Sequence, residues 1–350
     1  MSDFFHHLGL TAPIIQAPMA GVQNHRLALA VCEAGGLGSL PAAMLSPQAL
    51  QDELHALQAT TSVPFNVNFF CHANPAHDLE REALWHQTLA PYYRELGLDP
   101  AQIPSGPGRV PFGHDSADVL EAFRPAVVSF HFGLPAPDLL ARVKGWGSLV
   151  LSSATTVAEA LWLQAQGADA IIAQGLEAGG HRGMFLTHDL STQIGTFALL
   201  PQIVQAVNVP VIAAGGIATA QGVVAAQRLG ASGVQIGTAY LCSHEATTSA
   251  LHRAALQSPA AQHTALTNLF TGRPARGIVN RVMRELGPWC EQAPAFPLAT
   301  AGIAPLRAAA EAMGLSDFTP LWSGQNAADV RPLSATDITR DFVHAWLEKA

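Results

Sequence analysis

Short apolar runs rich in β-branched residues recur along this 350-residue chain, and each is followed by a polar or glycine-rich loop and a segment of helical periodicity. This alternation is typical of parallel βαβ units, because a parallel strand needs a crossover before the next strand begins. Eight such units predict an α/β fold of the TIM (β/α)8 barrel class. The candidate strands are Ile14–Met19, Leu37–Pro41, Pro64–Phe70, Val127–Gly133, Ser148–Ala154, Ala170–Gly175, Val209–Gly215 and Val234–Ala239.

The length fits one barrel plus an elaboration, because such barrels take about 250 residues. The expected barrel covers residues 1–242, and residues 243–350 form an appended, mostly helical subdomain that partly packs back on the barrel. Residues 71–124 are too long for an ordinary connection and are interpreted as an excursion with binding or lid elements. Helices are expected at Asn24–Ala34, Pro47–Ala59, Leu79–Leu96, Pro137–Trp146, Val157–Gln166, Thr196–Val207 and Thr219–Leu229.

The charge and cysteine content argue against several classes of partner. Lys+Arg is 18 against 26 for Asp+Glu, so a basic face for nucleic acid or an anionic membrane is not expected. The four cysteines form no CxxC pair, which favours a reducing compartment. Neither a signal peptide nor an apolar run of the roughly 18 residues that span a membrane is evident. We expect a cytoplasmic monomer or homodimer whose partners are small molecules.

The ends of the last two candidate strands lack side chains. The seventh runs into Gly215 and Gly216, and the eighth runs into Gly237 and Thr238. Backbone without side chains lets amide N–H groups approach an anion closely, and the loops after strands seven and eight are the usual phosphate site of such barrels. The alternative is that these glycines only serve tight turns between strand and helix. The paired placement favours a ligand that carries a phosphate.

A histidine lies on the glycine-flanked loop after the sixth strand. The loop Leu176–Gly183 reads LEAGGHRG and contains His181. An imidazole has an unperturbed pKa near neutrality, and at a barrel mouth it can meet a ligand, which suits general acid/base work. A structural histidine is the alternative, and the glycines on both sides make it the weaker one.

Neutral amides gather at the strand ends, where Asn66 and Asn68 share one face of the third strand, with Gln174 and Gln235 at later ends. Such a set suits a planar heterocycle better than a metal, which would call for clustered His, Cys or carboxylates. No metal site is therefore expected. On the fourth strand Ser129 and His131 are aligned, and His131 is either a substrate contact or a core hydrogen-bonding residue.

Several common chemistries leave no trace in the sequence. There is no GxxxxGK[ST], GxSxG or HExxH motif, which argues against P-loop, α/β-hydrolase and zincin chemistry. Neither of the two lysines, Lys144 and Lys349, falls on a strand end, which argues against a Schiff-base aldolase.

With these residues assembled, the chain closely resembles the class I nitronate monooxygenases, formerly called 2-nitropropane dioxygenases. The matching stretches follow one another in the family's order over most of the chain. They are Pro13–Gly21 (PIIQAPMAG), Val63–Phe70 (VPFNVNFF), Val127–Pro135 (VVSFHFGLP), Gly167–Gly183 (GADAIIAQGLEAGGHRG), Val209–Ile217 (VPVIAAGGI), Gly230–Tyr240 (GASGVQIGTAY), Thr267–Met283 (TNLFTGRPARGIVNRVM) and Pro320–Gln325 (PLWSGQ).

The resemblance implies an FMN-dependent barrel enzyme that oxidises alkyl nitronates such as propionate 3-nitronate with O2, giving a carbonyl compound and nitrite and so detoxifying nitro compounds. It implies that His181 is the catalytic residue, as base or as electrostatic anchor, with His131 and Ser129 beside the substrate. The cofactor contacts that it implies are Ala17, Pro18, Met19, Asn66, Gln174, Gly179, Gly180, Gly215, Gly216, Gln235, Ile236, Gly237 and Thr238.

Two other functions fit a flavin barrel. Relatives with a similar GG/GH loop are NAD(P)H-dependent flavin reductases of the enoyl-acyl-carrier-protein or quinone type, although the strand end SFHFGLP favours the monooxygenase. The third possibility is a flavin-binding protein without catalysis. Reduction by NADH, reduction by a nitronate, or neither would separate the three.

Overall fold

The computed structural model describes residues 5, 7–60, 62–105, 109–327 and 330–348. Eight parallel strands form its central sheet, so the predicted barrel class is confirmed. All eight are shorter than the sequence predicts. Four of them end earlier, because the residues after them turn away into loops at the barrel mouth, and three others begin later; one is shorter at both ends. The strands are β1 (Ile14–Gln16), β2 (Ser39–Pro41), β3 (Asn66–Phe70), β4 (Val127–His131), β5 (Leu149–Ala154), β6 (Ala170–Gln174), β8 (Val211–Ala214) and β9 (Gly233–Ile236).

The sheet closes on itself. Its strands follow the order β1-β9-β8-β6-β5-β4-β3-β2, so β1 and β2 are the two ends. Leu37, just before β2, joins these ends: its N–H donates to the Ile14 carbonyl at 2.8 Å, and its carbonyl accepts from the Gln16 N–H at 3.0 Å. Closure brings the carboxyl ends of all eight strands to one mouth.

Helices of about the predicted length cover the barrel, and several begin at hydroxyl caps. Thr156 accepts a hydrogen bond from the N–H of Glu159, and Thr219 accepts one from the N–H of Gly222. The covering helices are α2 (His25–Glu33), α3 (Pro47–Thr60), α5 (His114–Phe123), α6 (Pro137–Gly145), α7 (Val157–Ala165), α8 (Thr196–Ala206) and α9 (Ala220–Arg228). Helix α5 is not among the predicted helices; it lies at the end of the supposed excursion and packs on the barrel through Ala117, Leu120 and Phe123.

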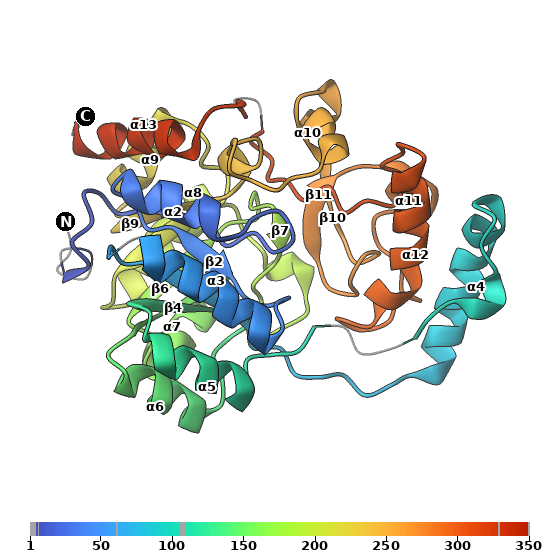
Figure 1. Cartoon of the computed structure of the whole chain (residues 1–350), viewed down its shortest axis with the longest axis horizontal. Helices are drawn as coiled ribbons and strands as arrows, with labels where there is room; N and C mark the ends of the chain where they lie inside the picture. The colour runs from blue at the N-terminus through green and yellow to red at the C-terminus, as the bar shows by residue number, and fades with distance from the viewer. Residues whose placement is uncertain (1–4, 6, 61, 106–108, 328–329, 349–350) are drawn as a thin grey trace.

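The eighth covering helix comes from the far end of the sequence. Helix α13 (Ala335–Leu347) packs against α2 and α9, beside the seam between β1 and β9 (Figure 1). Its buried face includes Ile338, Phe342 and Trp346, which join the main apolar cluster of the barrel. Part of the C-terminal segment 243–350, namely α13, therefore covers the barrel like the helices that follow its strands.

The rest of the C-terminal region forms a lobe together with α4 (Leu79–Glu95), which lies beside α12 on the right of Figure 1. Trp85 and Leu89 of α4 pack at Gly302 of α12, and Tyr93 donates a hydrogen bond to the Gly302 carbonyl at 2.7 Å. The division of the chain at residue 242 stays a prediction. The other elements of the lobe are α10 (Ala250–Leu256), α11 (Arg281–Glu285), α12 (Ala299–Ala312), β10 (Thr264–Thr267) and β11 (Ala275–Ile278).

A small antiparallel sheet connects this lobe to the barrel. Strand β11 pairs with β10 on one side and with β7 (Gly180–His181), in the loop after β6, on the other. The sequence pattern does not predict this sheet. The lobe also contains segments without helix or strand between its helices, such as residues 286–298 and 313–321.

Side chains inside the barrel change from apolar to polar toward the mouth. Val127 and Leu151 belong to the apolar plug near the closed end. Two residues further along the same strands, Ser129 and Ser153 line a cavity at the mouth. No helix among the described residues is both long and apolar enough to span a bilayer.

Candidate active site

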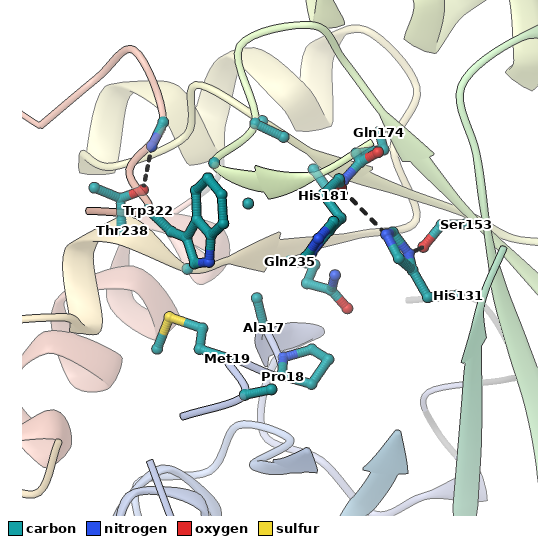
Figure 2. Close-up of a pocket in the computed structure, with 18 of the residues that line it drawn as sticks. Ala17, Pro18, Met19, His131, Ser153, Gln174, His181, Gln235, Thr238 and Trp322 are labelled. Atoms are coloured by element: carbon teal, nitrogen blue, oxygen red, sulfur yellow. Dashed lines mark hydrogen bonds between the residues drawn. The ribbon is translucent and has the colours of Figure 1, made fainter. Parts of the chain in front are cut away.

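A pocket opens where the barrel strands end. Its walls come from the loops after β1, β6, β8 and β9 and from the segment around Trp322 in the C-terminal lobe. Figure 2 shows Ala17, Pro18 and Met19 on one side of it, facing Trp322 and His181 on the other. All residues that the sequence predicts for cofactor, substrate and catalysis line this pocket except two, Asn66 and Ile236.

Asn66 and Ile236 lie below the pocket. Asn66 is fully buried and its Nδ2 donates to Ser39 Oγ at 2.9 Å, while Ile236 is buried in the apolar cluster of the barrel. The Ile236 carbonyl accepts from the N–H of Ala17 at 2.8 Å, so this residue fixes the pocket floor through its backbone. Asn68, on the same face of β3 as Asn66, lines the pocket.

The loop after β1 is held by a residue without a sequence signal of its own. The Oε1 atom of Gln23 accepts from the N–H of Met19 at 2.8 Å and from Nε2 of Gln16 at 2.7 Å. Because Gln16 ends β1, these bonds fix the Ala17–Met19 backbone relative to the barrel. The apolar side of the pocket is thereby set before any ligand binds.

Glycines let four loops meet at one end of the pocket. A Cβ on Gly179 would lie 2.5 Å from the backbone N of Gly324, closer than real Cβ atoms come. The Gly324 N–H in turn donates to Thr238 Oγ1 at 3.0 Å, and Asn326 Nδ2 donates to the Gly216 carbonyl at 3.0 Å. Gly216 has φ of +73°, a conformation that suits glycine. This end of the pocket therefore presents backbone from the loops after β6, β8 and β9 and from residues 323–326.

A buried amide oxygen in the pocket has no partner. Gln235 Oε1 is buried, and no described residue donates to it. A buried acceptor without a partner destabilises the fold unless a ligand or water satisfies it. Together with the backbone-lined end, this oxygen fits a heterocycle with a ring N–H at one end and an anionic group at the other.

The loop that carries His181 is clamped on both sides. On one side β7 pairs with β11, which sets His181 opposite Ala275. On the other side Gln174 Nε2 donates to the His181 carbonyl at 2.9 Å, and Gln174 Oε1 accepts from the Gly183 N–H at 2.7 Å. Much of the hydrogen-bonding capacity of Gln174 is thus used to position the loop.

The next residue, Arg182, is an internal brace. Its side chain is fully buried, and its guanidinium donates to the carbonyls of Gln174 and Gly175 at 2.7 and 2.6 Å. Its Nε donates to Gln193 Oε1 at 3.0 Å. A buried arginine with several satisfied donors makes the turn after β6 rigid.

His131 connects this loop to strand β5 through its two ring nitrogens. Its Nε2 lies 3.1 Å from the His181 carbonyl, which only accepts, so Nε2 carries the proton and Nδ1 accepts from Ser153 Oγ at 3.0 Å. Burial lowers the pKa of His131 to about 3, so the ring is neutral. Of the two interpretations that the sequence leaves open, the geometry favours hydrogen bonding within the protein.

The His181 ring packs among aromatic side chains and has one polar side-chain contact, with Thr271. Its ring centre lies 5.4 Å from that of Phe296 and 5.6 Å from that of Trp322, and its Nε2 lies 3.0 Å from Thr271 Oγ1. Thr271 Oγ1 uses its own hydrogen to donate to the Arg273 carbonyl at 3.4 Å, so towards His181 it acts as an acceptor and Nε2–H donates to it. In this tautomer Nδ1 keeps its lone pair.

The charge state of His181 follows from its surroundings. Burial lowers its pKa well below the usual 6.5, and the positive charges of Arg109 and Arg273 lower it further. The imidazole is therefore neutral near pH 7, which is the state a general base needs before proton transfer.

Several pocket residues have no recognisable sequence signal of their own. Arg109 and His252 line the pocket, and Phe296 packs against His181. Arg109 and Phe296 come from irregular segments, where no periodicity marks a residue. Thr271 lies in the matched stretch TNLFTGRPARG, which is the one signal that could have pointed to it.

His252 predicts a pH-dependent stability. The side chain is buried, its Nε2 donates to the Trp322 carbonyl at 3.1 Å, and burial lowers its pKa to about 4. Below pH 6.5 the unfolded chain binds a proton that the folded chain does not, so the free energy of unfolding falls as the pH falls from about 6.5 to 4.

Between pH 7 and 5 we expect His252 alone to account for a loss of about 2 kcal/mol, at about 1.4 kcal/mol per pH unit. Urea unfolding of His252→Gln should therefore show a shallower decline than the parent protein, whereas the exposed variant His188→Gln should follow the parent. Equal slopes for parent and His252→Gln would contradict the assignment.

Comparison with known proteins matches this architecture over nearly the whole chain. A family model described as nitronate monooxygenase matches residues 3–344. A nitronate monooxygenase of Pseudomonas aeruginosa is 40% identical over 98% of this chain and 99% of its own length. Among solved structures, nitroalkane oxidase from Streptomyces ansochromogenes has a TM-score of 0.87, 39% identity and 96% coverage of each chain. FabK from Thermotoga maritima has a TM-score of 0.73 and 25% identity, with 99% of this chain and 96% of the other covered.

Proposed function

Because the chain belongs to the nitronate monooxygenase family, we propose that it binds FMN and oxidises alkyl nitronates with O2 to a carbonyl compound and nitrite. The observation that carries the proposal is the neutral, oriented imidazole of His181 facing Ala17, Pro18 and Met19 across a pocket with a backbone-lined end. The family makes the chain a flavin-dependent oxidoreductase. The proposal adds the particular flavin, the oxidant and the products.

The residues at the two ends of the pocket support FMN. Gly216, Gly237 and Thr238 would hold its phosphate, because backbone N–H groups at strand ends suit an anion. The unpartnered Gln235 Oε1 would accept a ring N–H, and Ala17, Pro18 and Met19 would contact one ring face. When bound, FMN supplies the electron transfer between substrate and O2.

His181 would act on the substrate's α-carbon. With a neutral nitroalkane, Nδ1 takes the α-proton, while Thr271 keeps Nε2 protonated and fixes the ring plane. A nitronate has already lost that proton, so His181 then only contacts it. Phe296 and Trp322 exclude water around the ring, which keeps the imidazole neutral.

The lowered pKa of His181 predicts an unusual acid limit for nitroalkane oxidation. A base is active only while unprotonated, so kcat/KM for nitroethane should hold as the pH falls through 6.5 and decline only at lower pH. Initial rates of nitrite release between pH 5 and 8, measured on freshly diluted neutral nitroethane, would check this. A midpoint at or above 6.5 would contradict the neutral state assigned to the ring.

The decisive test compares electron donors. The purified protein should be yellow, release FMN on denaturation, and lose its visible absorbance when mixed anaerobically with ethylnitronate but not when mixed with NADH. Under air the ethylnitronate reaction should release nitrite. Rapid bleaching by NADH would instead support a reductase, and a yellow protein unreactive toward both would be a flavin-binding protein without this activity.

A further inference from the structure

A buried carboxylate lies behind the loop that carries His181, and the proposed reaction does not use it. Glu159 is in the first turn of α7, the helix after β5, and its side chain is fully buried. Its Oε2 accepts hydrogen bonds from the N–H and from the hydroxyl of Thr155, both at 2.7 Å. Its Oε1 accepts from the N–H groups of Phe185 at 2.6 Å and Leu186 at 3.3 Å. One carboxylate thus joins the end of β5 to the segment that follows His181.

The sequence around Glu159 would allow a simpler use of its carboxylate. Thr156 caps α7, and a glutamate three residues after a threonine cap commonly binds the N–H of the cap residue itself. Here the carboxylate binds Thr155 and residues 185–186. Burying a charge costs free energy unless enough donors surround it, and these donors come from two separate segments of the chain. The arrangement therefore fixes one segment relative to the other.

A second route leads from Glu159 to the residue next to His181. The Thr155 hydroxyl, which donates to Glu159, also accepts from Gln193 Nε2 at 2.9 Å. Gln193 Oε1 in turn accepts from Arg182 Nε at 3.0 Å. All four side chains are buried, so water competes little for these hydrogen bonds. The position of Arg182, and with it that of His181, is therefore coupled to Glu159.

Glu159 also supplies negative charge to two buried arginines of this region. Burial lowers the pKa of Arg182 to about 10 and that of Arg273 to about 10, and the charge of Glu159 opposes this lowering in both. Arg273 holds the same loop, because its guanidinium donates to the Met184 carbonyl. A buried cation is tolerated when an opposite charge lies near it. Without Glu159, both arginines that hold this loop would lose a stabilising charge.

The loop is thus held from two sides. Gln174 and His131 bind the His181 carbonyl from inside the barrel (Figure 2). Glu159 binds the continuation of the loop from the helical layer outside the barrel. A misplacement of about 1 Å in a reacting group lowers a rate by about 100-fold, so the second attachment matters for a base that must reach one carbon atom.

We propose that Glu159 is a positioning residue for proton removal: by fixing residues 182–186, it holds the His181 imidazole where Nδ1 reaches the α-carbon of a neutral nitroalkane. Glu159 is not among the residues that line the pocket, so it acts only through the loop. The inference rests on the proposed function, in which His181 is a base only toward a substrate that still has its α-proton. Loss of Glu159 should therefore affect nitroalkanes and nitronates unequally.

Glu159→Gln should lower kcat/KM for neutral nitroethane by about 10–100-fold and leave that for ethylnitronate within about threefold. A glutamine side chain has one acceptor oxygen, so it does not serve both Thr155 and the N–H groups of residues 185–186. The loss should appear in kcat rather than KM, because the residues that line the pocket are unchanged. Nitrite release from the two substrates at pH 8 measures the ratio. A variant that is only less well folded would lose both rates equally.

The matched control is Glu82→Gln. Glu82 lies on α4, is also buried, and has its Oε1 2.9 Å from His77 Nδ1. Its substitution should leave the substrate ratio unchanged. Thr155→Val is a milder second variant, which interrupts the route through Gln193 and should lower the ratio about fivefold. If Glu159→Gln does not fold, Thr155→Val carries the same test, and an unchanged ratio in it would count against the proposal.

A second measurement needs neither turnover nor flavin. In Glu159→Gln the backbone amides of residues 181–187 should exchange hydrogen with D2O about tenfold faster than in the parent protein, because Phe185 and Leu186 lose their acceptor. In Glu82→Gln the exchange of this segment should match that of the parent. Melting temperatures confirm that each variant is folded.

An unchanged ratio of the two substrates in folded Glu159→Gln would overturn the inference, and so would unchanged exchange of residues 181–187. The proposed function has a separate readout. If the parent protein releases nitrite from neither substrate while the exchange responds to Glu159→Gln and not to Glu82→Gln, the proposed function fails and the anchoring of the loop by Glu159 stands.

Discussion

His181→Asn should lower kcat/KM for neutral nitroethane by about a thousandfold and that for ethylnitronate by less than about tenfold. The two substrates share one carbon skeleton and differ by the α-proton, so their ratio isolates proton removal. A positioned general base contributes about 10²–10⁴ in rate, and asparagine keeps the polarity of the side chain but offers no base. Nitrite release from each substrate, followed at a fixed pH of 8, measures the ratio.

Two further results keep that experiment interpretable. Flavin content should match the parent protein, because His181 lies on the opposite side of the pocket from Ala17, Pro18 and Met19. His188→Asn, the same substitution at an exposed position on the following segment, should behave as the parent does. If His181→Asn lowered both rates equally, or neither, the imidazole would not act as the base.

Gly179→Ala should weaken FMN binding about 10–100-fold. The added methyl group would lie 2.5 Å from the Gly324 nitrogen and 2.6 Å from the Ser323 carbonyl carbon, both backbone atoms that side-chain rotation does not relieve. Overpacking of this kind costs about 1–3 kcal/mol or more, and tenfold in affinity is about 1.4 kcal/mol. To relieve this overlap, the loop after β6 and residues 323–324 must move apart. That movement displaces Gly324 from Thr238, at the end of the pocket assigned to the phosphate. Titration of the flavin-free protein with FMN gives the dissociation constant.

Gly145→Ala is the matched control, because a Cβ on Gly145, the last residue of α6, meets no atom within 4 Å. It should bind FMN as tightly as the parent. Circular dichroism and the melting temperature separate a local defect at Gly179 from general unfolding. Tight FMN binding by Gly179→Ala would show that this close approach of two loops does not shape the cofactor site.

Much of the pocket follows from local sequence, because strand ends carry their own signals. Gly215, Gly216 and Gly237 follow apolar runs of strand length, and closing the barrel brings the carboxyl ends of those strands to one mouth. Polar residues at alternating positions, such as Ser129 and His131, mark the inner face near that mouth. For these residues, periodicity and position along the strand are enough to predict that they lie at the barrel mouth.

Other features depend on contacts between distant segments. The pairing of His181 with Ala275 joins residues almost a hundred positions apart, and nothing in the sequence GGHRG announces a strand. The sequence pattern does not predict helix α5, because only three of its residues are buried and the rest of the segment is largely polar. Arg109 lies in the irregular segment before this helix, so only the folded chain brings it to the pocket.

The sequence also leaves the role of a polar side chain open where two partners compete for it. From the sequence, Gln174 is expected to contact the cofactor, and His131 to contact either the substrate or the core. In the structure both line the pocket, and much of their hydrogen bonding is directed to the backbone of residues 181–183. Their position at the mouth was predictable from alternation. Their orientation depends on where the loop after β6 runs, which β11 determines.

The position of α13 bears on how the protein is made. Synthesis runs from the amino end, and Ile338, Phe342 and Trp346, which pack beside the first and last strands of the barrel, are translated about a hundred residues after β9. Until α13 has been translated, the surfaces of α2 and α9 that it contacts lack their partner within the chain. We therefore expect a chain that ends before residue 335 to leave this apolar surface exposed to water and to aggregate more readily than the full chain.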